Sequence, residues 1–330
     1  MPESVVVVGA SLGGIEALGE MLPCLPIDFP APILLVVHTS SSGGGVYLSR
    51  VLRRVCSLPV LEARDGEKLQ PGRVYVPPSD HHLLVQDGML RVSHGPRENG
   101  FRPAIDPLFR SAAFYGRNLC VGVVLSGLLD DGAGGLLAIR QCGGQTVVQD
   151  PTEARHPEMP DNAIKMCQPD QILRITAIGK KLRELVCNPP PLSALEIPAP
   201  IAREVMLTQR AMGLLHHDHD IEAISQVGPL VPLTCPDCGG TLWQSSEHLR
   251  CHVGHSFSLE SLLVRQDHRL EEALWAAVRA FEEKRKTLEK ISGGSSQGLY
   301  QSRAEESQRY ADRIRELLLQ LDRSAQPPTK

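Results

Sequence analysis

Short apolar runs alternate with amphipathic stretches from residue 5 to about residue 185. Several runs contain no polar residue, as expected for strands covered on both faces. The predicted strands are residues 5–8, 33–37, 74–76, 120–125 and 146–149. The predicted helices between them are residues 14–22, 45–55, 106–115 and 132–141. This alternation indicates an α/β fold, a doubly wound and mostly parallel sheet with helices on both faces.

Other periodicities mark the rest of the chain. The sequence QDGM between residues 82–85 and 90–93 is typical of a β-hairpin turn. Residues 187–200 carry five prolines and no periodicity, which predicts a linker. Residues 259–322 have a helical apolar pattern that a glycine- and serine-rich run interrupts at 292–298, so two helices should fold back on each other.

These patterns divide the chain into five predicted segments. They are an α/β domain over 1–186, a proline-rich linker with a short helical segment over 187–232, a small cysteine-containing module over 233–258, a helical hairpin over 259–323 and a flexible tail over 324–330.

Composition excludes several classes of protein. Hydrophobic residues make up 42% of the chain and charged residues 22%, which predicts a well-packed core. The net charge is -4 and no basic tract occurs, so nucleic acids and anionic membranes are not expected partners. No apolar run is long enough to span or insert into a membrane, and no signal peptide is predicted. We therefore expect a cytoplasmic protein.

The glycine-rich loop after the first predicted strand has three interpretations. It could cradle a dinucleotide phosphate, form a G-x-S-x-G nucleophile elbow, or simply let Ser11 cap the next helix. Ser11 occupies the position of the middle glycine of a dinucleotide fingerprint, and the second strand ends at His38 where an acid would be needed. The chain order Ser, His, Asp also differs from the order in α/β-hydrolases.

Two further residues favour the nucleophile interpretation. His38 follows the apolar run ILLVV, and Asp131 follows VVLSGLLD, so each comes shortly after a predicted strand. Each also has a plain alternative, a loop histidine for His38 and a helix cap for Asp131. Because the carboxyl ends of parallel strands share one edge of a sheet, Ser11, His38 and Asp131 should lie near one another.

Several motifs in order resemble the chemotaxis protein-glutamate methylesterases of the CheB type. They are VVVVGASLGGIEAL, the strand ending in VVH, EARDGEKLQPGRVYVPPSDHHL, HGPRENGFRPAIDPLFRSAA and VGVVLSGLLDDGAGG. The resemblance spans residues 5 to about 185. It implies a serine hydrolase that demethylates glutamate methyl esters of chemoreceptors in a phosphorelay pathway, sometimes deamidates glutamine, and needs no catalytic cofactor.

The resemblance also assigns roles to individual residues. It implies Ser11 as nucleophile, His38 as general base and Asp131, not Asp130, as the third member of the triad. Leu12 and Leu128 take positions near the oxyanion site, where the family usually has threonine and methionine. Arg102 is a candidate for orienting an acidic receptor helix, and a surface salt bridge is an equal alternative.

Other departures from the family pattern concern the loops and regulation. The sequence after His38 is TSSSGGG, where the family has a more hydrophobic loop. The family usually places a receiver domain before the catalytic domain, and here the catalytic pattern begins at residue 5. Regulation by phosphorylation within this chain is therefore not expected. The rival interpretation is a catalytically weak interaction protein whose α/β domain only binds a receptor or signalling partner, with the C-terminal hairpin and the cysteine-containing module as the docking surface. The hairpin could also pair with partner helices.

The nine cysteines fall into two groups. Six are scattered and are expected to be small, mostly buried hydrophobic residues: Cys24, Cys56, Cys120, Cys142, Cys167 and Cys187. The remaining three have metal-site spacing, because Cys235 and Cys238 form a C-x-x-C and Cys251 follows with His255 four residues later. Adjacent His252 should point away.

This spacing predicts a structural zinc site in a zinc-ribbon-like module, with Cys235, Cys238, Cys251 and His255 as ligands. The alternatives are buried cysteines without metal, or a redox C-x-x-C. The polar run HHDHD at residues 216–220 is a second metal candidate, although a solvated turn explains it more simply.

Overall fold

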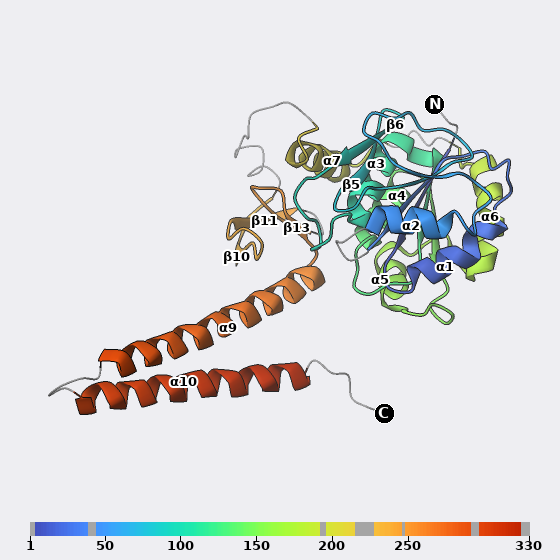
Figure 1. Ribbon diagram of the computed structural model, residues 1–330. Coiled ribbons are helices and arrows are strands. Elements are labelled where there is room, and N and C mark those ends of the chain that lie inside the picture. The colour runs from blue at the N-terminus through green and yellow to red at the C-terminus, as the bar shows by residue number, and fades with distance from the viewer. Residues whose placement is uncertain are drawn as a thin grey trace. The chain divides into compact units, whose positions relative to one another are not determined.

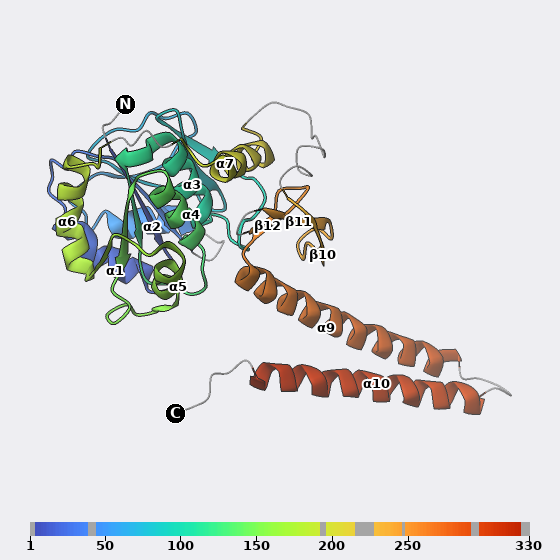
Figure 2. The same ribbon diagram turned by 180° about the vertical axis from the view of Figure 1, so that it is seen from behind.

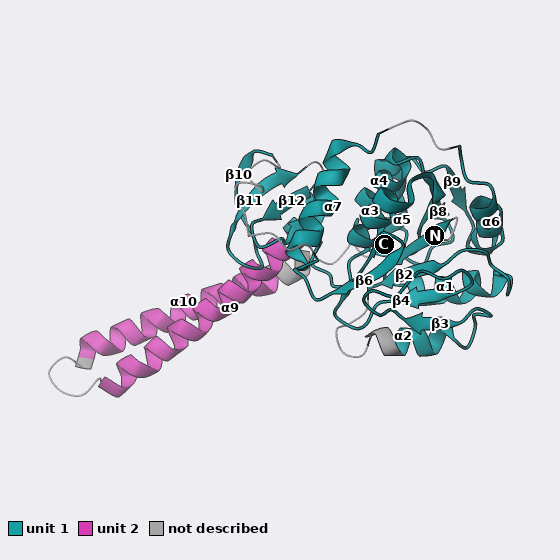
Figure 3. Ribbon diagram, turned by 90° about the horizontal axis from the view of Figure 1, so that it is seen from above, with its two compact units in different colours: residues 1–262 teal, residues 263–330 magenta. Residues whose placement is uncertain are grey.

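The computed structural model describes residues 4–38, 44–191, 196–214, 228–245, 248–291 and 297–324. The chain forms two compact units, residues 1–262 and residues 263–330 (Figure 3). The run at 216–220 and most of the loop after His38 lie outside the described residues. His38 and the other candidate site residues belong to the first unit.

A seven-stranded sheet forms the centre of the first unit (Figures 1 and 2). Its order is β3-β4-β2-β1-β7-β8-β9, and every neighbouring pair is parallel. The strands are β1 (Val5–Ala10), β2 (Ile33–Val37), β3 (Val60–Glu62), β4 (Val74–Val76), β7 (Cys120–Val124), β8 (Gln145–Gln149) and β9 (Gln171–Leu173). The strand order reverses at β1, so β2 lies on one side of β1 and β7 on the other.

Helices cover both faces of this sheet. Side chains alternate along β1, with Val6 and Val8 in one buried cluster and Val5 and Val7 in the other. The first cluster includes residues of α1 (Gly14–Met21), α2 (Gly44–Leu52) and α6 (Ile175–Cys187). The second includes residues of α3 (Ile105–Gly116), α4 (Ala133–Gln141), α5 (Glu158–Cys167) and α7 (Ala199–Ala211). The predicted doubly wound α/β fold is thus confirmed.

Most predicted elements agree with the structure to within a few residues. The predicted hairpin is present as β5 (His82–Gln86) paired antiparallel with β6 (Met89–Ser93). Short 3-10 helices at Leu22–Cys24 and Arg117–Leu119 follow α1 and α3. The edge strands β3 and β9 and the helices α5 and α6 were not predicted.

A small antiparallel sheet follows α7 in the same compact unit. Its strands are β10 (Leu230–Thr234), β11 (Thr241–Ser245), β12 (His248–Cys251) and β13 (Ser256–Phe257), in that order across the sheet. Cys235, Leu242, Leu249, Cys251 and Phe257 form its buried core together with Leu262. We call residues 228–258 the ribbon. The predicted division of this unit into catalytic domain, linker and ribbon stays a prediction.

The second unit contains most of α9 (Leu259–Ile291) and α10 (Gln297–Ser324). These helices form the predicted hairpin, with Val278, Ala311 and Leu318 buried between them. The Phe281 and Tyr310 rings lie 5.3 Å apart across the pair. Among the described residues, no helix combines the length and apolar character needed to cross a membrane.

Candidate active site

The three predicted triad residues follow three neighbouring strands. Ser11 comes directly after β1, His38 directly after β2, and Asp131 lies in the loop between β7 and α4. The carboxyl ends of these parallel strands meet at the point where the strand order reverses, the usual place for a site in an open α/β sheet. The structure therefore brings together the three residues that the sequence placed on this edge.

Ser11, His38 and Asp131 form one chain of hydrogen bonds. His38 Nδ1 lies 3.2 Å from Ser11 Oγ, and His38 Nε2 lies 2.8 Å from Asp131 Oδ2. An ionised carboxylate only accepts hydrogen bonds, so the proton belongs on Nε2 and the lone pair of Nδ1 faces the serine. His38 thus faces the serine with Nδ1 and the aspartate with Nε2. In serine proteases the two nitrogens are exchanged, and Nε2 faces the serine.

Neither Ser11 nor Asp131 caps the helix that follows it. The N-cap of α1 is Gly13 and that of α4 is Gly132, both in the left-handed conformation and without a side-chain cap bond. The capping alternative for each residue is thus not what the structure shows. Gly127 also approaches Ser11 closely, since a Cβ added at Gly127 would lie 2.8 Å from Ser11 Cβ.

Asp131 is fully buried and receives four hydrogen bonds. Its Oδ2 atom accepts from His38 and from the Ile105 backbone amide at 2.7 Å. Its Oδ1 atom accepts from Asn99 Nδ2 at 2.9 Å and from the Asp106 backbone amide at 3.2 Å. The two amides open helix α3, whose N-terminus favours a negative charge. These donors hold the carboxylate in one orientation.

Residues 98–101, which we call the 98–101 loop, contact two members of the triad. The Phe101 ring stacks on His38 with 3.7 Å between ring centroids and 8° between the planes. Asn99 donates to Asp131 and also to Asp106 Oδ2 at 3.0 Å. Asn99, Phe101 and Asp106 have no role predicted from the sequence, although all three lie in the family-like motif HGPRENGFRPAIDPLFRSAA.

The other predicted substrate-binding residues have different surroundings. Leu12 and Leu128 are 53% and 40% exposed. Leu12 follows Ser11 in the chain, and Leu128 follows Gly127, which lies close to Ser11. Both leucines therefore present apolar surface near the nucleophile. Arg102 instead makes a bidentate pair with Asp80 at 3.0 and 2.8 Å and donates to the Gly95 carbonyl oxygen. The structure thus shows the salt-bridge alternative, and a substrate role for Arg102 stays a prediction.

Asp130 lies next to the triad and has an altered pKa. Burial, with the negative charges of Asp106, Glu260 and Asp131, raises the pKa of Asp130 to about 6 despite a hydrogen bond from Ser258. The folded state thus holds this proton more tightly than the unfolded chain. The resulting cost to stability is absent below the unfolded pKa and fully present above the folded pKa.

We expect Asp130→Asn to stabilise the protein increasingly as pH rises. The advantage over wild type should grow by about 2–3 kcal/mol between about pH 4 and pH 7, because the amide does not ionise. Denaturant unfolding of both proteins at several pH values measures it. A free-energy difference that does not change with pH would contradict the raised pKa.

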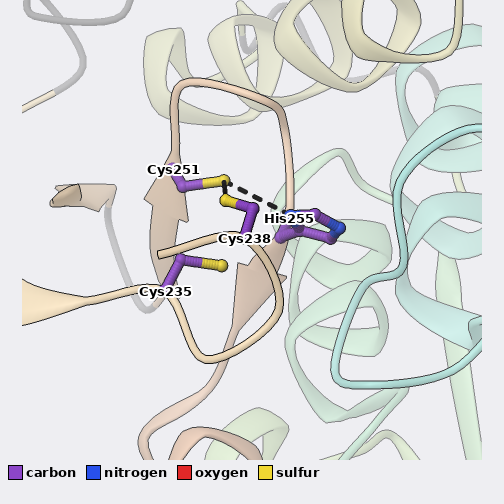
Figure 4. Close-up of side chains that lie close together, drawn as sticks. All are labelled: Cys235, Cys238, Cys251 and His255. Atoms are coloured by element: carbon purple, nitrogen blue, oxygen red, sulfur yellow. Dashed lines mark hydrogen bonds between the residues drawn. The ribbon is translucent and has the colours of Figure 1, made fainter. Parts of the chain in front are cut away.

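A second candidate site lies in the ribbon. Cys235, Cys238, Cys251 and His255 point toward one another, and their ligand atoms all lie within 4.8 Å of one another (Figure 4). The Cys238 and Cys251 sulfurs are 3.6 Å apart, and Cys251 Sγ is 3.5 Å from His255 Nδ1. Sulfur ligands of a tetrahedral zinc ion, each about 2.3 Å from the metal, would lie about 3.8 Å apart. The donor set and its spacing therefore fit a metal ion.

The cysteines of this cluster do not ionise alike. A hydrogen bond from Cys235, together with the neighbouring His255, lowers the pKa of the Cys251 thiol, while the same hydrogen bond raises the pKa of Cys235 and burial raises that of Cys238. The thiolate is the form of cysteine that binds metals. His252 is exposed and is not among the four clustered residues, as the sequence predicts. Among the described residues, this is the only group of at least three such side chains placed to hold a metal.

Comparisons with known proteins concern the first part of the chain. The family model described as CheB methylesterase matches residues 6–182. A crystal structure of the Thermotoga maritima CheB methylesterase catalytic domain superimposes with a TM-score of 0.53 at 34% identity, covering 56% of this chain and 98% of that domain. The ribbon and the helical hairpin lie outside the family match.

Two curated relatives show the same extent of similarity. A protein-glutamate methylesterase/protein-glutamine glutaminase of Anaeromyxobacter dehalogenans is 44% identical over 182 residues, which cover 55% of this chain and 53% of the relative. A putative enzyme of the same description from Leptospira interrogans is 39% identical over 176 residues, 53% of this chain and 91% of the relative. The match therefore spans only about half of the Anaeromyxobacter relative.

Proposed function

The chain belongs to the CheB methylesterase family, and from that premise we propose that it is a serine esterase that removes methyl groups from glutamate side chains of a methyl-accepting chemoreceptor. The observation that carries this proposal is the hydrogen-bonded series of Ser11, His38 and Asp131 at the carboxyl edge of the sheet. All three residues lie inside the family match.

In the proposed reaction, Ser11 Oγ attacks the carbonyl carbon of the glutamate methyl ester. Its proton moves to His38 Nδ1, and Asp131 stabilises the imidazolium that forms. The bond to the methoxy group then breaks, and this group leaves as methanol after taking the proton from His38. The short contacts of His38 with Ser11 and Asp131 support this assignment of roles.

Backbone amides of Leu12 and Leu128 are the proposed donors to the tetrahedral oxyanion. Within the described part of the chain, neither amide donates a hydrogen bond to another backbone or side-chain group. Each is therefore free to bind a developing negative charge, a contribution of about 3 kcal/mol in comparable sites. The neighbouring Leu129 has a φ of 63°, a strained conformation for leucine that is typical of functional loops.

Hydrolysis of the acyl enzyme completes the proposed cycle. His38 accepts a proton from water, the hydroxide attacks the acyl carbon, and Ser11 leaves with the proton returned. The same steps deamidate a glutamine if ammonia leaves in place of methanol. The names of the relatives include both activities, which supports proposing both here.

The substrate partner is proposed from the same set of observations. The exposed Leu12 and Leu128 beside Ser11 would contact apolar positions of a receptor helix. Such an enzyme works where the receptor's methylated segment lies, in the cytoplasm. The hairpin of α9 and α10 exposes Leu270, Trp275 and Leu319 and is a proposed surface for partner helices.

Methanol release tests the proposed function. The purified protein is incubated with receptor fragments that have been methyl-esterified by a methyltransferase, and methanol is measured with loss of the ester. Unmethylated fragments and the Ser11→Ala variant serve as blanks. Equal release by wild type and Ser11→Ala would show that the chain is not the proposed esterase, as the rival interaction-protein interpretation requires.

We also propose that the ribbon binds one structural zinc ion through Cys235, Cys238, Cys251 and His255. With four protein ligands the site would be closed, so the metal would stabilise the ribbon and take no part in the ester chemistry. Among the described residues, the buried hydrophobic core of the ribbon contains only five of its own side chains, together with Leu262 of α9. Small modules of this kind commonly depend on a metal for stability.

Removal of one ligand should abolish zinc binding. We expect wild-type protein to carry about one zinc per chain and Cys238→Ser to carry well below half, because structural zinc contributes about 10 kcal/mol or more to small zinc modules. Metal analysis of the purified proteins measures this. Cys187→Ser is the matched control, since Cys187 is exposed and outside the cluster. Full zinc content in Cys238→Ser would contradict the site.

A further inference from the structure

The ribbon is joined to the α/β part of the first unit by buried charges. Arg250 of β12 is 1% exposed, and its guanidinium donates to Glu204 at 3.0 Å and to Glu98 at 3.3 Å. Glu98 also pairs with the buried Arg110 of α3. Buried charges are tolerated only when their partners are in place, so this arrangement fixes the position of the ribbon.

The ribbon also holds the 98–101 loop through its backbone. The Asn99 amide donates to the Ser256 carbonyl oxygen at 2.7 Å, and residues 98 and 256 form a β-bridge. The Asn99 side chain is held as well, because its Oδ1 atom accepts from the Ser258 amide at 2.9 Å and from Ser261 Oγ at 3.2 Å. The other end of this side chain donates to Asp131.

A third contact reaches the triad through Asp106. His248 Nε2 lies 3.1 Å from Asp106 Oδ2, and Asn99 Nδ2 donates to that same oxygen and to Asp131. Both His248 and Asp106 are buried. Although burial alone would have the opposite effect on each group, their mutual pairing raises the pKa of His248 and lowers that of Asp106. Without His248, Asp106 would lose a hydrogen-bond donor on the oxygen that it shares with Asn99.

A single strand connects these contacts with the cysteine cluster. Side chains on β12 alternate, so His248 and Arg250 contact the α/β part while Leu249 and Cys251 enter the ribbon core. The strand is four residues long, and Cys251 is one of the four clustered residues. Disorder at the cysteine cluster would therefore also displace His248, which lies on the same strand.

We infer that the ribbon is part of the catalytic centre, in which His248 and Asn99 act as positioning residues for Asp131. His248 acts through Asp106 and Asn99, and the 98–101 loop carries Phe101 against His38. This inference rests on the proposed serine esterase function. It extends the centre beyond residue 182, where the family match ends.

The test compares three single variants of the full chain. His248→Ala removes the bond to Asp106, His248→Gln keeps a donor of similar reach, and His252→Ala alters an exposed histidine of the same ribbon. Two readouts are used. One is kcat and KM for methyl-esterified receptor fragment, and the other is the rate at which a fluorophosphonate labels Ser11, where Oγ bonds to phosphorus and fluoride leaves.

For His248→Ala we expect kcat and the labelling rate to fall together by about 10- to 100-fold, because the triad residues would be misplaced. KM should stay nearly unchanged. His248→Gln should recover most of both rates, and His252→Ala should match wild type. Zinc content and thermal midpoint are measured beside them. If His248→Ala does not fold, Asn99→Gly gives the same comparison, because glycine tolerates the φ of 51° at residue 99.

Two results would overturn the inference. A raised KM with unchanged labelling would make the ribbon a receptor-docking module only. A lowered thermal midpoint with unchanged labelling per folded molecule would make the contact merely structural. Failure of the proposed function gives a different result, since wild-type protein would then label at Ser11 without releasing methanol, or would do neither.

Discussion

Replacement of Ser11 by alanine should lower methanol release by about 10⁵- to 10⁶-fold, to the level that the remaining site can supply without a nucleophile. Ser11 Oγ is the only triad atom that bonds to the substrate in the proposed reaction, so no other group can replace it. Because Ser11 does not cap α1, its loss should leave the helix and the thermal midpoint nearly unchanged. Single-turnover assays with methyl-esterified receptor fragment measure the rate.

A matched serine-to-alanine substitution elsewhere in the chain shows whether the loss of rate is specific to Ser11. Ser57 is exposed and comes before the start of β3, whereas the triad residues follow the carboxyl ends of their strands, so Ser57→Ala should retain the full rate. Mass spectrometry of wild-type protein quenched during turnover should also detect an acyl group that Ser11→Ala does not form. Retention of more than about one hundredth of the rate in Ser11→Ala would rule out the nucleophile role.

Asp131→Asn should lower kcat by about 10³- to 10⁴-fold while the protein still binds substrate. All four groups that hydrogen-bond to the Asp131 carboxylate are donors, namely His38, Asn99 and two amides of α3. An asparagine must place its NH₂ group against one of them. If it faces His38, it donates to Nε2 and moves the ring proton to Nδ1, which can then no longer accept the proton of Ser11.

Asp130→Asn is the control for this experiment, since Asp130 precedes Asp131 and bonds to Ser258 and not to His38. It should change kcat by less than about tenfold, because the triad keeps its hydrogen bonds. Nitrogen NMR of the His38 ring should report the Nε2–H tautomer in wild type and in Asp130→Asn, and the other tautomer in Asp131→Asn. Similar kcat values for the two variants would show that Asp131 is not the third triad member.

The central fold could be predicted because its strands are buried on both faces. An apolar run such as 33–37 has no other simple explanation, and the observed β2 has the same bounds. The edge strands β3 and β9 were missed because each has only three residues and partly exposed side chains. Short edge strands carry little periodicity, and their partners are chosen by tertiary packing.

The triad could be predicted for a similar reason, because Ser11, His38 and Asp131 each stand next to a recognisable strand. The supporting residues carry no such local mark. Asn99 has a positive φ in an irregular loop, and its partner Ser258 is 159 residues away in the chain. His248 and Asp106 are separated by 142 residues. Contacts of this range follow from the folded arrangement, which one sequence does not reveal.

These long separations have a consequence for how the protein is made. Domains tend to fold as the chain leaves the ribosome, beginning with the N-terminal part. A nascent chain that has released the whole sheet and α7 would still lack Ser256, Ser258 and His248, which hold Asn99 and Asp106. The residues that make these contacts come more than two hundred residues after Ser11 in the chain, so synthesis itself would delay the onset of activity.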